Sequence, residues 1–130
     1  MKIIDDISTF SKQELKQRAK GIDENQKFPK DLVKELAEQK FLSVIFPKKL
    51  GGLELDPIDY GLFLEHAAKY CSNVRNLFLV SMSMVGGTIL KCGTKEQIER
   101  WVPQIIDGSA IGAFSLTEPD SGSDISSLKT

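Results

Sequence analysis

The feature that most constrains the fold is an uncharged stretch from Asn76 to Leu90, inside a helix pattern that runs from Arg75 to Lys91. Its residues are apolar on nearly every side, which is typical of a helix that neighbouring elements cover completely. The stretch is shorter than the roughly 20 residues that a bilayer-spanning helix needs. Two adjacent glycines, Gly86 and Gly87, each cost about 1 kcal/mol relative to alanine, and they predict either a closely packed neighbour or room for a ligand. The stretch therefore predicts the central helix of a bundle.

Further helix patterns lie on both sides of this stretch. Each begins with a charge-rich or capping segment and then repeats apolar residues at the spacing of one helix face. The predicted helices cover residues 11–20, a segment that opens at Phe28-Pro29, a segment that opens at Asp56-Pro57, and a segment that Thr94 and Gln97 begin as a capping box and Gly108 ends. We expect an all-α bundle of about five to six helices over residues 1–109.

The composition is that of an ordinary globular domain. The chain has 130 residues, of which 41% are hydrophobic and 27% charged, and its formal net charge is −1. A chain of this length can bury a core without metal or disulfide staples. Because it has no large excess of positive charge, we expect no nucleic-acid partner.

The cysteines and the start of the chain bear on compartment and metal binding. The first residues, MKIIDDISTFSKQELKQRAK, carry acidic and basic side chains and no long apolar run. They predict no secretion signal, and the expectation is a cytoplasmic protein without a membrane partner. Cys71 and Cys92 have neither CxxC nor any other metal-ligand spacing. We predict reduced, buried thiols and no metal site.

Residues 110–130 break the helical pattern. Ala110–Leu116 is a strand-like apolar run, and a single strand is not stable without a hydrogen-bonded neighbour, so its partners are expected beyond Thr130 or in another chain. In the turn that follows, Pro119 fixes the backbone and Gly122 allows successive N–H groups to face one acceptor. These residue types fit two interpretations, a solvated surface turn or a loop that holds a polar heterocycle and its phosphates.

Three stretches carry a resemblance to the acyl-CoA dehydrogenase family. FSLTEPDSGSDISSLKT, residues 114–130, resembles the family's flavin-contacting segment, which has TEP, a small pair, GSD and a later threonine. FPKKLGGLELDPIDYGLFLEHAAK is similar to its P-x-x-x-GG segment with a later tyrosine, glutamate and alanine. GTKEQIERWVPQIIDGSAIGAFSLTEP is similar to the GT-x-x-Q segment that runs into TEP. The motifs occur in the family's order, and the resemblance covers most of residues 30–130.

The resemblance implies a domain arrangement. Family members have an N-terminal helical domain, a middle β-domain and a C-terminal helical bundle, with FAD bound between them and usually across a subunit interface. Residues 1–109 are expected to form the first domain, and residues 110–130 the first strand and loop of an incomplete β-domain. The full-length protein is expected to be a homo-oligomer.

The resemblance also implies roles for five residues. Phe114, Leu116 and Thr117 are expected beside the isoalloxazine ring of FAD, where hydrogen bonds to the polar ring edge tune its electron demand. Gly122 and Ser123 are expected at the phosphate-bearing tail of the cofactor. Ser123 is also expected to contact the substrate.

The implied reaction is α,β-dehydrogenation of an acyl thioester carried on coenzyme A or on acyl carrier protein. The family's glutamate base lies outside this stretch, so no catalytic residue is assigned and the 130-residue chain alone is expected to be inactive. Glu118, which precedes a proline, is typical of a structural anchor, and His66 of a surface or packing residue. Met82, Met84 and Gly86 fit either the wall of an acyl-chain tunnel or a plain core.

Two other classes of function stay open at the level of the sequence. One is a helical docking domain that keeps the fold without catalysis, and the other is an oxygen-using flavoprotein relative. The resemblance leaves the electron acceptor open. Asp124 is expected to fix the terminal turn by accepting hydrogen bonds from backbone N–H groups.

Overall fold

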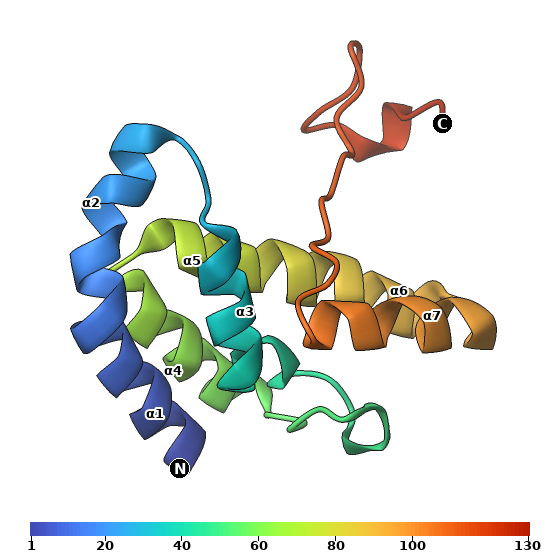
Figure 1. Ribbon diagram of the computed structural model, residues 1–130. Coiled ribbons are helices and arrows are strands. Elements are labelled where there is room, and N and C mark those ends of the chain that lie inside the picture. Colours follow the sequence, from blue (N-terminus) through green and yellow to red (C-terminus); the bar gives the residue numbers. More distant parts are fainter.

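The computed structural model describes all residues from 1 to 130, and its helices join into five continuous rods. The elements are α1 (Lys2–Phe10), a π turn (Ser11–Leu15), α2 (Lys16–Asn25), α3 (Lys30–Glu38), α4 (Pro57–Ala68), α5 (Ser72–Leu77), a π-helical stretch (Phe78–Gly86), α6 (Gly87–Cys92) and α7 (Lys95–Ile106), with 3-10 turns at Phe41–Ser43, Lys48–Leu50 and Ile125–Ser127. Figure 1 shows the rods gathered in one body, from which the C-terminal segment stands away. The predicted all-α class is confirmed.

The first rod is longer than the sequence predicts. It runs through α1, the π turn and α2, whereas the charge-rich pattern predicted a helix over residues 11–20 only. The additional turns bury Ile3 and Ile7, which lie one helical turn apart on the side of α1 that packs against α4. Ile4 and Phe10 also pack against the core, so residues 3, 4, 7 and 10 carry a one-face helix repeat that the prediction overlooked.

The core is organised around phenylalanine rings from different elements. Phe41, Phe63 and Phe78 are fully buried, and each meets its neighbour at a ring-centroid distance of 5.8 or 5.0 Å. Phe10 extends the row at 5.4 Å from Phe41. Edge-on and tilted aromatic pairs at these separations add about 0.5–1.5 kcal/mol each beyond the area they bury. The row therefore ties the first rod, the 3-10 turn, α4 and the π-helical stretch together.

The P-x-x-x-GG segment forms a compact loop between α3 and α4. Gly51 has a φ of 88°, which favours glycine, and a Cβ on Gly52 would lie 1.9 Å from the carbonyl oxygen of Phe46. The close approach of this backbone holds Phe46 fully buried beneath the loop. Both glycines of the motif thus have a steric reason.

The glycine pair of the central rod divides into two different environments. A Cβ on Gly86 would lie 2.6 Å from Cζ of Phe46, whereas a Cβ on Gly87 would meet nothing within 4 Å. Gly86 therefore lets the loop phenylalanine pack against the rod. Of the two predicted explanations, close packing applies to Gly86, and the neighbour is a loop residue.

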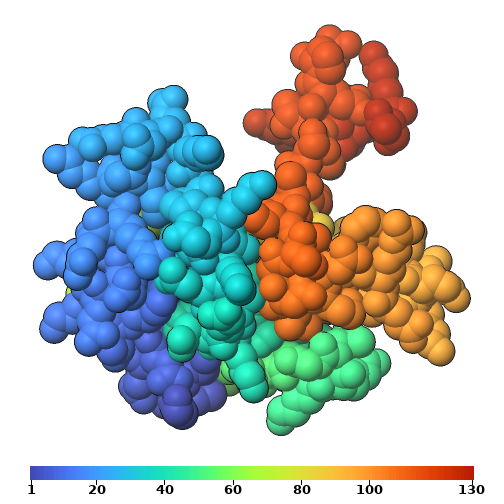
Figure 2. Space-filling view, in the orientation of Figure 1, coloured from blue at the N-terminus to red at the C-terminus, as the bar shows by residue number.

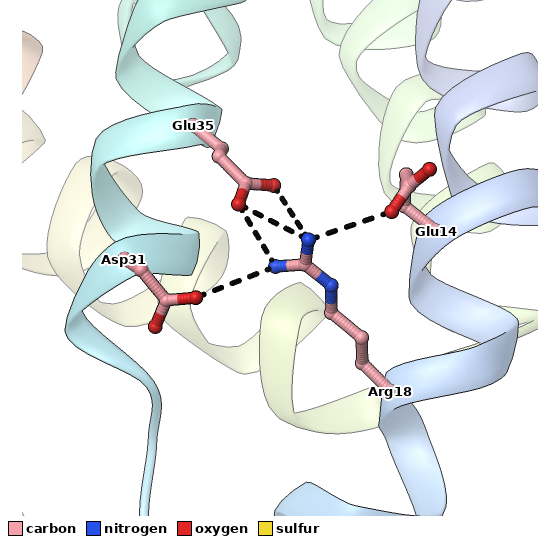
Figure 3. A network of polar contacts seen from close by, with 4 residues as sticks. All are labelled: Glu14, Arg18, Asp31 and Glu35. Carbon is pink, nitrogen blue, oxygen red and sulfur yellow. Dashed lines mark hydrogen bonds and ion pairs between the residues drawn. The ribbon is translucent and has the colours of Figure 1, made fainter.

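An ion cluster around Arg18 joins the first rod to α3 (Figure 3). Both terminal nitrogens of the Arg18 guanidinium donate to Oε1 of Glu35 at 3.1 Å. Glu14 lies 3.4 Å and Asp31 3.8 Å from the same group. The hydrogen bonds to Glu35 raise the pKa of Arg18 further above its ordinary value. A two-pronged guanidinium contact fixes orientation as well as charge, so the cluster sets how α3 lies on the first rod.

Two helix starts follow their predicted capping chemistry. Oδ1 of Asp56 accepts hydrogen bonds from the N–H groups of Ile58 and Asp59 at 2.8 and 2.9 Å. The Thr94 N–H donates to the Gln97 side chain at 2.8 Å, while the Gln97 N–H donates to the Thr94 hydroxyl at 3.3 Å. The predicted capping box is confirmed.

The two cysteines of the chain differ in their exposure. Cys71 is buried as predicted, but Cys92 is exposed, so the prediction of a buried thiol is wrong there. Cys92 is the last residue of α6, a helix in which no residue is buried. No helix combines the length and the apolar character that crossing a bilayer requires.

Candidate functional site

The candidate site begins where the chain leaves α7. Gly108 ends this helix with a φ of 75°, and the Ala110 N–H then donates to the Gln104 carbonyl at 2.9 Å. Two residues later, the Gly112 N–H donates to the hydroxyl of Ser81 in the π-helical stretch, also at 2.9 Å. Beyond Gly112 the chain rises from the helical body and forms a separate knob (Figure 2).

No strand forms over Ala110–Leu116 in this chain. The N–H and C=O groups of residues 113–117 neither donate nor accept a hydrogen bond within the chain. A strand is defined by a hydrogen-bonded neighbour, and no other segment lies alongside this one. The strand-like pattern thus appears as an unpaired extended connection.

The turn after this connection is closed by its own hydrogen bonds. The N–H of Glu118 donates to the carbonyl of Ser121 at 2.8 Å, and the N–H of Ser121 donates back at 3.2 Å, with Pro119 at the corner. The Ser121 hydroxyl, buried in the turn, donates to the Asp124 carbonyl at 2.6 Å. Oδ1 of Asp124 accepts from the N–H of Ser126 at 3.1 Å, as predicted. Hydrogen bonding by Ser126 also lowers the pKa of Asp124.

Glu118 anchors the end of the described chain to the turn. Its two carboxylate oxygens accept from the N–H groups of Lys129 and Thr130, each at 3.0 Å. Hydrogen bonds from Thr130 and Lys129 lower the pKa of Glu118, which therefore stays ionised at neutral pH. An ionised carboxylate that is already hydrogen-bonded on both oxygens fits the predicted structural role.

The five predicted site residues lie along this connection and turn. Phe114 and Leu116 are 42% and 43% exposed, which is unusual for large apolar side chains in one short segment. Thr117 and Gly122 meet across the turn, since a Cβ on Gly122 would be 3.7 Å from Cγ2 of Thr117. Ser123 follows directly and is exposed. Thr117, Gly122 and Ser123 are thus brought together, while Phe114 and Leu116 lie on the connection that leads to them.

The polar groups of these residues fit a ligand that accepts hydrogen bonds. The N–H groups of Leu116, Thr117, Gly122 and Ser123 make no hydrogen bond within the chain, nor do the hydroxyls of Thr117 and Ser123. The absence of a side chain at Gly122 lets an acceptor approach the backbone closely. Free donors beside exposed apolar side chains suit a heterocycle with a polar edge and a phosphate tail.

The residues proposed for an acyl-chain wall do not share one surface. Met82 is fully buried in the core, whereas Met84 is 39% exposed, and the space beside Gly86 holds the Phe46 ring. His66 is half-buried on α4 and makes no hydrogen bond through its side chain. Met82 and Gly86 thus serve the core in this chain.

One apolar groove was not predicted from the sequence. It has a volume of about 510 Å³ and lies between α6, α7 and residues 110–112. Val85, Ile89, Cys92, Trp101 and Ile111 are among its lining residues. Its signal in the sequence is Trp101, a large side chain at the edge of the apolar face of α7 that is 38% exposed.

The comparisons with known proteins decide the family. Residues 1–109 match the family model described as "Acyl-CoA dehydrogenase, N-terminal domain". The chain belongs to the acyl-CoA dehydrogenase family. It is 35% identical over 121 residues to the mitochondrial short-chain specific acyl-CoA dehydrogenase of Bos taurus, which covers 93% of this chain and 29% of that protein.

Two further relatives extend this result to a reductase and to a solved structure. The chain is 37% identical over 110 residues to the caffeyl-CoA reductase-Etf complex subunit CarC of Acetobacterium woodii, covering 84% of this chain and 29% of that subunit. A glutaryl-CoA dehydrogenase of Mycobacterium smegmatis, solved in complex with FADH2, superposes with a TM-score of 0.90 at 29% identity, over 99% of this chain and 33% of that one. The chain thus spans about a third of the length of the relatives it matches.

Proposed function

We propose that this chain is the N-terminal part of an FAD-dependent acyl-thioester dehydrogenase that catalyses α,β-dehydrogenation. Residues 1–109 form the helical domain, and residues 110–130 begin a second domain that contacts the cofactor. The observation that carries the proposal is the group of unpaired hydrogen-bond donors at Thr117, Gly122 and Ser123, next to the exposed Phe114 and Leu116. Membership of the acyl-CoA dehydrogenase family supports it.

Each of the five site residues is assigned to one part of the cofactor. Phe114 and Leu116 cover the apolar part of the isoalloxazine ring and keep water from it. The backbone N–H of Leu116 and the hydroxyl of Thr117 donate to the polar ring edge, which stabilises negative charge there. The N–H groups of Gly122 and Ser123 donate to phosphate oxygens, because a glycine turn presents successive N–H groups to one anion.

Bound FAD would supply the hydride acceptor for oxidation of the thioester. The chain's own residues position that acceptor, and the Ser123 hydroxyl is free to donate to the thioester-bearing substrate. Glu118 is not the proton acceptor, since its two carboxylate oxygens hold Lys129 and Thr130. A carboxylate base is therefore supplied by a part of the full-length protein outside these residues.

The substrate is proposed to be an acyl thioester on coenzyme A, as the names of the relatives indicate for those proteins. Acyl carrier protein remains the competing carrier. The name of the Acetobacterium woodii relative refers to an Etf complex, so an electron-transferring flavoprotein is the proposed redox partner. The full-length protein is proposed to be a homo-oligomer.

The test uses full-length protein purified with its natural cofactor. It is expected to be yellow, to contain FAD and to lose its visible flavin absorption when butyryl-CoA is added without oxygen. Butyryl-acyl carrier protein serves as the second donor, and oxygen consumption during turnover identifies an oxidase. A colourless full-length protein that does not bind added FAD would refute the proposal and favour the docking-domain alternative.

Two variants test the role of Thr117. Thr117→Val keeps the shape of the side chain but removes the hydroxyl, and we expect FAD affinity to fall about tenfold, equivalent to the loss of roughly 1.4 kcal/mol. Thr117→Ser keeps the hydroxyl and serves as the matched control, with affinity close to that of the unmodified protein. Equal FAD affinity in both variants would contradict the assigned hydrogen bond.

A second direction of the reaction is supported by the reductase among the relatives. When bound in its reduced form, FAD would supply hydride for reduction of an enoyl thioester, and the same residues, Phe114, Leu116, Thr117, Gly122 and Ser123, would hold it. Reoxidation of the reduced full-length protein by cinnamoyl-CoA and by crotonyl-CoA separates the two directions. Rapid reoxidation by cinnamoyl-CoA together with no reduction by butyryl-CoA would assign the reductase activity.

A further inference from the structure

We propose that Ser81 is a positioning residue for the cofactor site, because its hydroxyl fixes the point at which the flavin-contacting connection leaves the helical body. The inference rests on the proposed function, since it concerns how Phe114, Leu116 and Thr117 are aimed. Ser81 itself does not touch the cofactor in this proposal. It acts through the backbone of Gly112.

Gly112 is the last fixed point before the site. Its N–H donates to the Ser81 hydroxyl at 2.9 Å, and residues 113–117 then make no hydrogen bond with any part of the chain. The next hydrogen-bonded backbone group is the N–H of Glu118, which belongs to the terminal turn. Gly112 is therefore the last point at which a hydrogen bond ties the connection to the helical body in this chain.

A steric contact fixes the same point from the second side. A Cβ on Gly112 would lie 2.7 Å from Cβ of Val85 and within 2.9 Å of both its methyl groups. Only glycine allows the backbone to come this close. Val85 and Ser81 belong to the same π-helical stretch, so one rigid element supplies both the hydrogen bond and the surface on which Gly112 rests.

The second serine hydroxyl of the π-helical stretch has a different partner from that of Ser81. Ser81 is 3% exposed, and the hydroxyls of Ser83 and Tyr60 lie 2.7 Å apart in a hydrogen bond. The Tyr60 hydroxyl also donates to the carbonyl of Phe78 at 3.2 Å, which gives a partner to one carbonyl of this wider helix. π-helical segments are commonly found at functional sites. Here the stretch carries two hydroxyls with separate partners.

A small rotation of the backbone at Gly112 produces a large displacement at Thr117. Thr117 is five residues beyond Gly112, a length of about 17 Å in an extended chain at roughly 3.3 Å per residue. A rotation of about 10° at Gly112 moves Thr117 by about 3 Å, which is more than the difference between a hydrogen bond and no contact. A small displacement at Gly112 is thus enough to move the donors at the far end away from the ring edge.

The test measures FAD binding by the full-length protein in three serine variants. Ser81→Ala is expected to weaken FAD binding about tenfold, equivalent to about 1.4 kcal/mol, and to shift the visible absorption bands of the bound flavin. Ser81→Thr keeps the hydroxyl and is expected to restore both the affinity and the spectrum. Ser83→Ala removes a hydroxyl from the same stretch without touching Gly112 and is expected to leave both unchanged.

Variants at Gly112 and Val85 test the position of the Gly112 backbone without changing a serine. Gly112→Ala is expected to weaken FAD binding through contact with Val85, and adding Val85→Gly is expected to recover the affinity, because it removes Cβ of Val85 as well as both methyl groups. The melting temperature of the cofactor-free protein is recorded for every variant, so that a loss of folding is recognised. These variants keep the proposal testable if Ser81→Ala does not fold.

The outcomes separate this inference from the proposed function. Unchanged FAD affinity and spectrum in Ser81→Ala, with FAD bound by the unmodified protein, would overturn the positioning role and leave the function intact. An equal loss in Ser81→Ala and Ser83→Ala would also overturn it, since it would indicate general stability of the helix. Failure of the unmodified protein to bind FAD would overturn both.

Discussion

The adjacent glycines of the central rod provide a matched pair for a stability prediction. Gly86→Ala places a methyl group 2.6 Å from Cζ and 2.7 Å from Cε1 of Phe46. Gly87→Ala places the same methyl group where nothing lies within 4 Å. The two substitutions share the gain in helix propensity, so they differ in packing alone.

The magnitudes follow from these contacts. Replacing a helical glycine by alanine raises the free energy of unfolding by about 1 kcal/mol. Phe46 is fully buried with the backbone of Gly52 pressed against it, so its ring has little freedom to move, and overpacking of this kind costs about 1–3 kcal/mol. We therefore expect Gly87→Ala to stabilise the protein, and Gly86→Ala to be less stable than Gly87→Ala by about 1–3 kcal/mol.

Urea unfolding measures this difference. Far-UV circular dichroism and the fluorescence of Trp101, the single tryptophan, report the transition, and unchanged slopes show that the midpoints reflect stability. Adding Phe46→Leu to Gly86→Ala should recover part of the loss, because the shorter side chain vacates the contact. Equal stabilities of the two alanine variants, or strict additivity with Phe46→Leu, would refute the packing explanation.

Two further predictions concern polar groups. The Ser11 hydroxyl is fully buried without a hydrogen-bond partner, so Ser11→Ala is expected to raise the free energy of unfolding by about 1 kcal/mol in the same urea experiment, and a loss of stability would contradict this. The hydrogen bonds from Thr130 and Lys129 lower the pKa of Glu118. These bonds therefore stabilise the folded turn fully at pH values above the unfolded pKa of about 4.3, and this stabilisation is lost as the pH falls through the lower, folded pKa. Protection of the Lys129 amide against hydrogen exchange should therefore decrease over the same pH range. Glu118→Gln should abolish this pH dependence, because glutamine does not titrate. An unchanged profile in Glu118→Gln would contradict the assignment.

The helix starts were the most predictable part of the fold, because capping chemistry is local. Asp56 with Pro57, and Thr94 with Gln97, need only residues within one turn to satisfy the first free N–H groups. The structure places helix starts at both signals. In contrast, α1 depends on Ile3 and Ile7 packing against α4, which follows more than forty positions later in the chain, at Pro57–Ala68.

Exposure was harder to predict than helix type. Cys92 directly follows the predicted helix pattern of Arg75–Lys91, and its thiol is exposed at the end of α6, where α6 and α7 extend beyond the other helices (Figure 1). The uncharged stretch indicates which residues are apolar, but the length of a rod relative to its neighbours is a property of the assembled bundle. The apolar groove beside Trp101 arises from the same protruding part of α6 and α7.

The site shows the same division between local and distant effects. The turn from Glu118 to Asp124 closes through bonds between residues a few positions apart, and the structural roles of both carboxylates could be predicted from the sequence. The contact between Ser81 and Gly112 spans 31 positions and joins a core helix to an unpaired connection. No local pattern distinguishes Ser81 from Ser83, which bonds Tyr60 instead.

These contacts give a physical reason for glycines that lie far from the candidate site. Gly52 holds Phe46 under its loop, and Phe46 fills the space beside Gly86 at the end of the π-helical stretch. That stretch presents Ser81 to Gly112, where the connection to the site begins. Because each contact is close enough to exclude a methyl group or is a hydrogen bond, we expect displacement of one member to shift the next, which a double-mutant cycle between Gly52→Ala and Ser81→Ala would measure. If Ser81 positions the site as proposed, the P-x-x-x-GG motif is expected to act on it indirectly, through Phe46 and the π-helical stretch.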